Sequence, residues 1–317
     1  MNPPAFWQRD GLVPLLLSPL SHLVAGATRR RVRQSGVTMP VPVLCCGNAS
    51  VGGAGKTTVV LDLVRRLRRR SIAVHCLTRG YGGRVRDVLR VDLARHSAAA
   101  VGDEPLLLAA EAPTWIGADR AASARAAVAA GAEFLLMDDG LQNPGLSKTA
   151  SLLIVDGAVG FGNGRVMPAG PLREPAGEAA LRCRAAVLIG ADHAGAHAAM
   201  GDLPVLDAWL EPDRSLEGKR VFAFCGIGRP GKFFETATAA GAVLAGSARF
   251  ADHHPYTMRD IQAVLAEAKR LHARPLTTAK DAVRIAETLR PQIDVLGVKL
   301  MWRDERAVER MLDEVIV

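Results

Sequence analysis

A glycine-rich segment between a strand pattern and a helix pattern is the feature that most constrains the fold. Residues 41–46 form an apolar run typical of a buried strand, and residues 57–70 carry apolar side chains at helical spacing. Glycines between them let backbone N–H groups turn toward phosphate oxygens at the N-terminus of the helix. We therefore predict a P-loop that binds a nucleoside triphosphate, although the position that is glycine in a strict P-loop is Ser50. The segment reads Ser50-Val51-Gly52-Gly53-Ala54-Gly55-Lys56-Thr57.

Polar side chains within and beyond this loop suit the chemistry of a nucleotide. Lys56 can reach the terminal phosphates, and the hydroxyl of Thr57 can hold Mg²⁺. Asp138 and Asp139 follow the apolar strand pattern of residues 134–137, where a Walker B carboxylate binds the metal directly or through water. The loop and the acidic pair together predict a site for a nucleotide and its magnesium ion.

Two absent signatures narrow the class of nucleotide-binding protein. The guanine-reading pattern Asn/Thr-Lys-x-Asp is missing, because Thr278-Ala279-Lys280-Asp281 has its lysine in a different place. We therefore expect ATP and not GTP. ParA- and MinD-like ATPases have a signature lysine just before the glycine pair, where this chain has Val51. A dimerising regulatory ATPase is accordingly disfavoured.

Strand and helix patterns alternate along the chain, which is typical of an α/β fold with a parallel sheet. We expect a P-loop NTPase-type parallel sheet domain and a second, smaller α/β domain. The rhythm breaks at a glycine- and proline-rich stretch, and a second series of strand patterns follows it at residues 185–189, 221–225, 242–244 and 295–298. The predicted division is 1–28 as an N-terminal segment, 29–157 as the nucleotide-binding domain, 158–175 as a connection and 176–317 as the second domain.

Composition and charge limit the function classes. With 49% hydrophobic and 23% charged residues, the chain is neither disordered, collagen-like nor a polytopic membrane protein. Its net charge of +8 favours anionic partners, which are nucleic acid, phosphorylated metabolites or an anionic membrane face. The 5 cysteines include no CxxC pair, so we expect reduced thiols and no zinc site.

The N-terminal segment is apolar and is followed by arginines. Residues 11–28 carry no formal charge, and Arg29, Arg30, Arg31 and Arg33 come next. The run is shorter than the roughly 20 apolar residues of a spanning helix, and polar residues and prolines interrupt it. An interfacial helix that docks on anionic headgroups and a helix that packs on its own domain are both compatible with this pattern.

Four further polar residues can each be interpreted in two ways, as structural or as functional. Asp103 opens a helix pattern, where its carboxylate suits the helix dipole, but it can also accept a proton from an attacking hydroxyl. His253 follows Asp252, and a histidine paired with a carboxylate can deprotonate an alcohol near neutral pH. Arg79 and Arg173 stand in glycine-rich loops, where each can grip a phosphate or stabilise a turn.

Seven segments in order make the chain resemble the tetraacyldisaccharide 4′-kinases of lipid A biosynthesis. They are residues 47–57, Thr78-Arg79-Gly80-Tyr81-Gly82, Gly102-Asp103-Glu104-Pro105, Asp138-Asp139-Gly140-Leu141-Gln142, residues 168–175, Phe250-Ala251-Asp252-His253 and residues 278–283. The resemblance implies a two-domain kinase that transfers the γ-phosphoryl group of ATP to the 4′-hydroxyl of a tetraacylated glucosamine disaccharide 1-phosphate. It also implies a peripheral protein on the cytoplasmic face of a Gram-negative inner membrane.

The same resemblance implies roles for individual residues. Lys56 would neutralise the β- and γ-phosphates, and Asp103 with His253 would activate the sugar hydroxyl. Thr57, Asp138 and Asp139 would hold Mg²⁺ and its waters, with Asp139 also serving the reaction. Contacts to nucleotide, transferred phosphoryl or substrate would come from Arg79, Gln142 and Arg173. The nucleotide itself would lie against Asn48, Ser50, Val51, Gly52, Gly53, Ala54, Gly55, Lys56, Thr57 and Thr58.

The resemblance also bears on the N-terminus and on competing functions. A substrate with four acyl chains leaves a bilayer only at a cost of about 0.8 kcal/mol per CH₂, so docking of residues 12–24 on the anionic membrane surface is favoured. A membrane-associated switch ATPase that regulates a partner is the alternative function. Nucleic acid is not an expected partner, because no recognised binding motif is present. The chain departs from the family pattern at Ala54, Thr58, Asn143 and Ala279.

Overall fold

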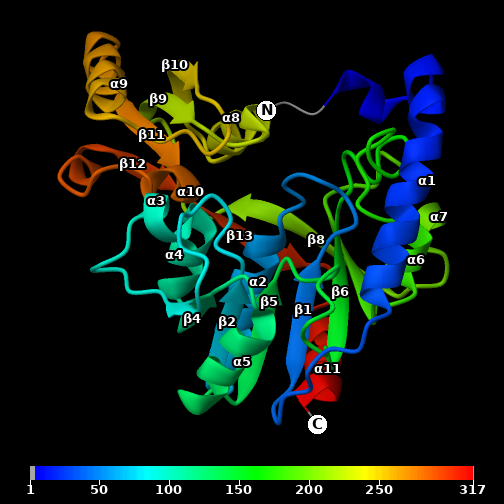
Figure 1. The fold of residues 1–317 in the computed structure, drawn as a ribbon. Coiled ribbons are helices and arrows are strands. Elements are labelled where there is room, and N and C mark those ends of the chain that lie inside the picture. The colour runs from blue at the N-terminus through cyan, green and yellow to red at the C-terminus, as the bar shows by residue number, and fades with distance from the viewer. Residues whose placement is uncertain (1–3, 317) are drawn as a thin grey trace.

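A computed structural model describes residues 4–316 of the chain, which form two sheets with helices on both faces (Figure 1). This arrangement confirms the predicted α/β class. The larger sheet has nine strands in the order β13-β8-β7-β6-β1-β5-β2-β4-β3. Its members are β1 (Val43–Gly47), β2 (Val74–Thr78), β3 (Leu89–Arg90), β4 (Thr114–Ile116), β5 (Phe134–Asp138), β6 (Ala150–Asp156), β7 (Ala185–Ile189), β8 (Val205–Pro212) and β13 (Val298–Trp302).

The central strands of this sheet are parallel and buried on both faces. Leu44 and Cys46 of β1 face α2 and α11, whereas Val43 and Cys45 face α5. Near-continuous apolar runs are typical of such doubly covered strands. The helices are α1 (Leu12–Val32), α2 (Lys56–Arg69), α3 (Ala98–Val101), α4 (Asp103–Ala109), α5 (Arg120–Ala129), α6 (Ala176–Ala180), α7 (Ala196–Met200) and α11 (Glu305–Ile316), with a 3₁₀ turn at Ala5–Gln8.

The smaller sheet has four parallel strands in the order β10-β9-β11-β12. Its strands are β9 (Arg220–Cys225), β10 (Val243–Arg249), β11 (Arg274–Thr278) and β12 (Asp294–Leu296). Helix α8 (Pro230–Ala239) packs on one face and α9 (Met258–Arg270) on the other. The short α10 (Ala279–Ala282) follows β11, and a 3₁₀ turn covers Arg290–Gln292. This small domain lies beside α3 and α4 of the large one (Figure 1).

The division of the chain differs from the one expected from the sequence. Strand β7 follows the 158–175 stretch, yet it pairs in parallel with β6. The chain returns to the large sheet with β13, and α11 packs beside α2. Residues 158–175 are therefore an excursion within the large domain, and only the part from β9 to β12 forms the small sheet. The alternating pattern is the same in both sheets, so periodicity alone did not separate them.

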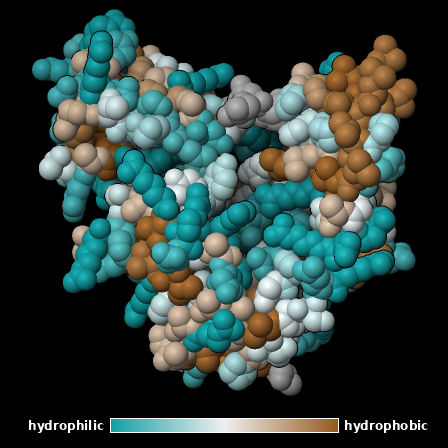
Figure 2. Space-filling model, in the orientation of Figure 1, coloured by the Kyte–Doolittle hydropathy of each residue, from teal (hydrophilic) through white to brown (hydrophobic). Residues whose placement is uncertain are grey.

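Helix α1 lies along the outside of the large domain (Figure 1). One face is buried through Pro14, Ser21 and Ala25, and the Ser21 hydroxyl donates a hydrogen bond to the Val166 carbonyl. The opposite face carries exposed large apolar side chains, at Leu12, Val13, Leu15, Leu16, Leu20 and Leu23. They form the hydrophobic patch at the upper right of Figure 2. Within residues 4–316, no helix has the length and apolarity needed to cross a bilayer.

Candidate active site

The phosphate loop connects β1 to α2 and begins the candidate site. Gly52 and Gly55 have positive φ values of 118° and 86°, a backbone conformation that side chains disfavour. Ser50 instead forms an antiparallel bridge with Leu172, so its backbone is extended and tolerates a side chain. The Val51 N–H donates to the Pro171 carbonyl at 2.8 Å. The excursion at residues 158–175 therefore supports the loop, which explains why serine is accepted where a strict P-loop has glycine.

Lys56 is the first residue of α2 and is held over the loop by two groups. Its Nζ donates to Oδ1 of Asn48 at 3.1 Å and lies 3.7 Å from Oδ2 of Asp139. Asp139 also accepts two hydrogen bonds from the fork of Arg173, at 2.8 and 3.1 Å. Burial raises the pKa of Asp139, but Lys56 and Arg173 outweigh it and hold that pKa below its usual range. Asp139 is thus an ionised carboxylate between two cations.

Thr57 and Asp138 form a pair of oxygen ligands beside the loop. The Thr57 hydroxyl donates to Oδ2 of Asp138 at 3.1 Å, while Oδ1 of Asp138 is buried without a hydrogen-bond partner among residues 4–316. Burial, and next the charge of Glu104, raise the pKa of Asp138 to about 7. A buried carboxylate with an unsatisfied oxygen fits a bound cation.

The Thr57–Asp138 pair suits magnesium better than it suits a metal that protein side chains coordinate alone. Mg²⁺ commonly takes one or two protein carboxylates and completes its shell with water and substrate phosphates. The part of the chain that the structure describes contains no group of three or more His, Cys, Asp or Glu side chains placed to hold a metal by themselves. The residues present therefore fit a cation that arrives with a nucleotide.

The structure brings Asp103 and His253 together from the two domains. Asp103 starts α4 and is buried, and His253 lies in the loop after β10. Nδ1 of His253 is 3.0 Å from Oδ2 of Asp103, and the ring of Tyr81 meets the imidazole edge-on at 5.6 Å. Burial raises the pKa of Asp103, but His253 and the nearby cations hold it below its usual range. The pair is a hydrogen-bonded histidine and carboxylate, the arrangement of a general base.

Gln142 and Arg173 are close to the phosphate loop but are engaged with protein groups. Nε2 of Gln142 donates to the Asn48 carbonyl at 2.9 Å and to Oε1 of Glu174 at 2.8 Å. Its Oε1 accepts from Nη1 of Arg173 at 3.3 Å. Glu174 is buried and also binds Arg182. We did not predict Glu174 from the sequence, although its place directly after Arg173 in the glycine- and proline-rich stretch was a usable signal.

Arg79 and Arg120 are two cations at the ends of neighbouring strands. Arg79 follows β2 and is exposed, and no side-chain hydrogen bond joins it to another predicted site residue within 4–316. Arg120 begins α5 and is buried, with an unpartnered Nε among the described residues. Burial, and next the charge of Arg79, lower the pKa of Arg120 to about 10. Arg120 was not predicted, because it stands in an alanine-rich helix pattern without a motif.

The remaining predicted nucleotide contacts, Gly53, Ala54 and Thr58, lie in or directly after the loop. Added side-chain bulk at Gly53 would meet open space, so this stretch of backbone is free to approach a ligand. Ala54 is buried against the core under α2. The Thr58 N–H donates to the Gly55 carbonyl at 3.1 Å and so takes part in the first helical turn. These three positions shape the loop through its backbone.

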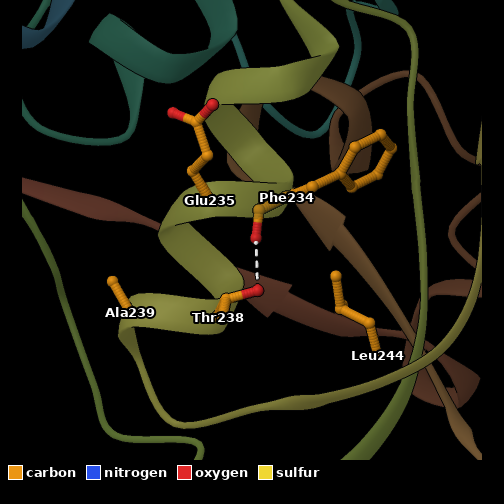
Figure 3. A pocket seen from close by; sticks show the side chains of 5 residues that line it. All are labelled: Phe234, Glu235, Thr238, Ala239 and Leu244. Atoms are coloured by element: carbon orange, nitrogen blue, oxygen red, sulfur yellow. Dashed lines mark hydrogen bonds between the residues drawn. The ribbon is translucent and has the colours of Figure 1, made fainter.

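A hollow lies elsewhere, on the small domain (Figure 3). It has a volume of about 520 Å³ and is bounded by α8 and β10, at Phe234, Glu235, Thr238, Ala239 and Leu244. The Thr238 hydroxyl is already bonded to the Phe234 carbonyl at 3.0 Å. None of the residues predicted to serve the site lines this hollow, so the phosphate loop and not the hollow is the candidate active site.

Comparisons with known proteins agree with this geometry. Residues 13–317 match the family model described as tetraacyldisaccharide-1-P 4′-kinase. The tetraacyldisaccharide 4′-kinase of Gluconacetobacter diazotrophicus is 55% identical over 99% of this chain and 98% of its own length. The enzyme of that name from Rhodospirillum centenum is 52% identical over 98% of this chain and 96% of its own.

A solved structure supports the fold. The crystal structure of LpxK from Aquifex aeolicus, described as an "apo" form in complex with ATP, aligns with 96% of this chain and 100% of its own, with a TM-score of 0.77 at 23% identity. The family resemblance inferred from the seven segments is confirmed. Because the family model covers residues 13–317 and relatives are 55% and 52% identical over nearly the whole chain, the chain belongs to the tetraacyldisaccharide-1-phosphate 4′-kinase family.

Proposed function

We propose that this protein transfers the γ-phosphoryl group of ATP to the 4′-hydroxyl of a tetraacylated glucosamine disaccharide 1-phosphate. The observation that carries the proposal is the Asp103–His253 pair beside a phosphate loop. Helix α4, which begins at Asp103, contacts α2, the helix that follows the phosphate loop. A switch ATPase needs the loop but has no use for such a pair, and the relatives at 55% and 52% identity carry the kinase name.

The nucleotide side of the site neutralises phosphate charge. The N-terminus of α2 and the Lys56 ammonium face the place where the β- and γ-phosphates bind. Thr57, Asp138 and Asp139 are the residues that would hold Mg²⁺, and the ion would supply positive charge against the phosphates. Asp139 fixes both Lys56 and Arg173, and so aims two cations at the transferred group. Arg173 and Gln142 keep the loop in the conformation that receives ATP.

The acceptor side of the site removes a proton. The 4′-hydroxyl oxygen attacks the γ-phosphorus, the bond from that phosphorus to the β–γ bridging oxygen breaks, and ADP leaves. The hydroxyl proton passes to the Asp103–His253 pair, which is already hydrogen-bonded and carries an ionised carboxylate. Arg79 is exposed, and within residues 4–316 it forms no side-chain hydrogen bond with the other predicted site residues. In this proposal it binds the anionic substrate.

The acceptor is a lipid, and α1 provides the means to reach it. Leu12, Leu16 and Leu23 are between 71% and 78% exposed, which is unusual for leucines unless they meet an apolar partner. Arg30 and Arg31 stand in the last turn of the same helix, where they meet anionic headgroups, while Arg29 beside them is paired with Glu178. The protein accordingly docks peripherally on the cytoplasmic face of the inner membrane. There the four acyl chains of the substrate remain in the bilayer.

A transfer assay tests the function directly. The protein is mixed with γ-labelled ATP, Mg²⁺ and tetraacyldisaccharide 1-phosphate in detergent micelles, and labelled lipid is separated from ATP. We expect label in the lipid with the unmodified protein and about a 1,000-fold loss with Lys56→Ala. The matched control is Lys299→Ala, an exposed lysine on β13. Label absent from the lipid while the protein still binds ATP would overturn the kinase proposal and leave the phosphate loop in place.

A further inference from the structure

Arg284 is a buried arginine just after α10 that neither the sequence motifs nor the proposed function uses. Its guanidinium donates to the carbonyls of Gly226 at 2.9 Å and His254 at 3.0 Å. Its Nη2 also meets Oδ1 of Asp281 at 2.7 Å. Nε lies 3.6 Å from Oδ2 of Asp103, across the contact between the two domains. One planar group thus contacts the loops of the small domain and the buried acid of the large domain.

The two carbonyls that Arg284 holds lie on either side of the His253 backbone. The Gly226 carbonyl also accepts the His253 N–H at 3.1 Å, and the His254 carbonyl belongs to the next residue. His253 has a φ of 57°, a left-handed conformation that is uncommon for any residue with a side chain. Such a conformation persists only where the surroundings hold it. The Arg284 guanidinium therefore helps to hold the His253 imidazole in its orientation.

Asp281 in turn fixes Arg284. Its side chain is fully buried, and Oδ1 accepts hydrogen bonds from the Gly226 N–H and the Tyr256 hydroxyl as well as from Arg284. Oδ2 accepts from the Thr278 hydroxyl at 2.6 Å. The carboxylate is therefore saturated with donors, and it balances the buried charge of the guanidinium. Paired and fully bonded charges of this kind set geometry more than they add stability.

We propose that Arg284, held by Asp281, is the positioning residue that orients His253 and aligns Asp103 with it across the two domains. This inference rests on the proposed kinase function, because it assigns the pair to the acceptor hydroxyl. Arg284 donates its hydrogen bonds to protein groups, namely Asp281 and the carbonyls of Gly226, His254 and Lys280. It acts through the backbone of His253 and through its charge on Asp103.

Because Arg284 is charged and lies near Asp103, its loss should change how turnover depends on pH. His253, Lys280 and Arg284 face Asp103, while Glu104 is next to it and Asp252 lies 3.8 Å from Nε2 of His253. Burial raises the pKa of Asp103, and His253, Lys280 and Arg284 lower it. Loss of the guanidinium removes one of the groups that lower the pKa of Asp103, so this pKa rises. The acidic limb of turnover against pH then moves to higher pH.

The experiment compares three variants in the lipid-transfer assay. Arg284→Met removes both the fork and the charge, and Arg284→Lys keeps the charge but loses the two-carbonyl grip. The control is Arg290→Met, because Arg290 also donates to two backbone carbonyls of the same domain, those of Ile285 and Val283. We expect kcat of Arg284→Met to fall by about 100-fold, with KM for ATP unchanged. Its acidic limb should move up, while the limb of Arg284→Lys should stay and its kcat should fall by about tenfold.

A second arm separates positioning from folding. In a His253→Ala background, Arg284→Met should cost little more, because the group it positions is already gone. Equal losses for Arg284→Met and the Arg290→Met control, or an additive loss in the His253→Ala background, would overturn the inference. If Arg284→Met does not fold, Arg284→Lys decides, and unchanged kcat there would also overturn it. Absence of transfer by the unmodified protein would refute the kinase function instead.

Discussion

Asp103 at the N-terminus of α4 and His253 after β10 lie 3.0 Å apart, although 150 residues separate them in the chain. Asp103 belongs to the domain of the large sheet and His253 to the domain of the small sheet, so the hydrogen bond exists only when the two domains are docked. A proton acceptor built in this way is complete only when the two domains are in contact. The pair therefore links the architecture to the proposed chemistry.

Substitution of this pair tests whether its members act together. Asp103→Ala and His253→Ala should each lower kcat by about 10²- to 10⁴-fold and change ATP affinity little, because both act on the acceptor hydroxyl. The double variant should be little worse than either single one. Steady-state kinetics of the four proteins in the lipid-transfer assay give the result. Losses that add in log rate would contradict a joint role.

Asp138 should control the magnesium requirement. Asp138→Asn removes a charged ligand beside Thr57, so the Mg²⁺ concentration for half-maximal transfer should rise at least about tenfold. A magnesium titration at saturating ATP and acceptor measures this. The control is Asp119→Asn, because Asp119 caps α5 through the Ala122 N–H and asparagine caps equally well. A similar magnesium requirement in both variants would exclude Asp138 as a ligand.

Asp138 should also make the metal-free protein less stable as the pH rises. Its folded pKa of about 7 lies above the ordinary value of about 3.9, so the folded state holds a proton that the unfolded state has released. The resulting stabilisation, a few kcal/mol, is complete below about pH 4 and is lost as the pH approaches 7. Denaturant unfolding in EDTA should show this slope in the unmodified protein and a smaller one in Asp138→Asn. Parallel curves would refute the raised pKa.

The exposed face of α1 should carry membrane binding. Substitution of Leu12, Leu16 and Leu23 by serine removes apolar surface that is mostly exposed, so folding should be little affected. Binding to anionic liposomes should fall at least about tenfold, because each leucine loses its apolar burial. A flotation assay compares the triple variant with Leu93→Ser/Leu181→Ser/Leu244→Ser, which alters exposed residues elsewhere. Equal flotation of the two proteins would eliminate α1 as the docking element.

The C-terminal helix should be part of the nucleotide domain. Leu312 of α11 is fully buried in the same apolar cluster as Val59 and Leu63 of α2. Leu312→Ala should therefore cost about 2–5 kcal/mol of unfolding free energy. Denaturant unfolding measures this, with the exposed Leu181→Ala as control. A loss below about 1 kcal/mol would show that α11 contributes little to that core.

Local patterns predicted much of the fold and the individual chemistry of the site. The strand, glycine loop and helix at residues 41–70 predicted the phosphate loop, because hydrophobic periodicity and glycine placement are short-range properties. Asp138 and Asp139 were predicted for the same reason, since they directly follow a buried strand. The helical spacing of apolar residues at 258–271 predicts a helix, and α9 ends one residue earlier. A helical pattern at residues 282–289 also predicts a helix, but the structure has a series of turns there after α10.

Motif order placed Asp103 and His253 in one family pattern, but their hydrogen bond is a tertiary contact. The same holds for Glu174, Arg120 and Arg284, whose roles come from what they touch across the chain. No periodicity distinguishes such an arginine from a solvated one. Burial and the partners brought by other elements make that distinction.

The sequence by itself determined the apolar runs that form β1, β5, β7 and β9, and the glycine-rich loop that follows β1. The tertiary structure alone decided that β7, β8, β13 and α11 belong with the phosphate loop and that β9–β12 form a separate sheet. The physical reason is that an apolar run indicates that a strand is buried but does not indicate which strand lies next to it. Strand order depends on the pairing of segments far apart in the chain, and the same long-range packing sets the 3.0 Å contact of Asp103 with His253.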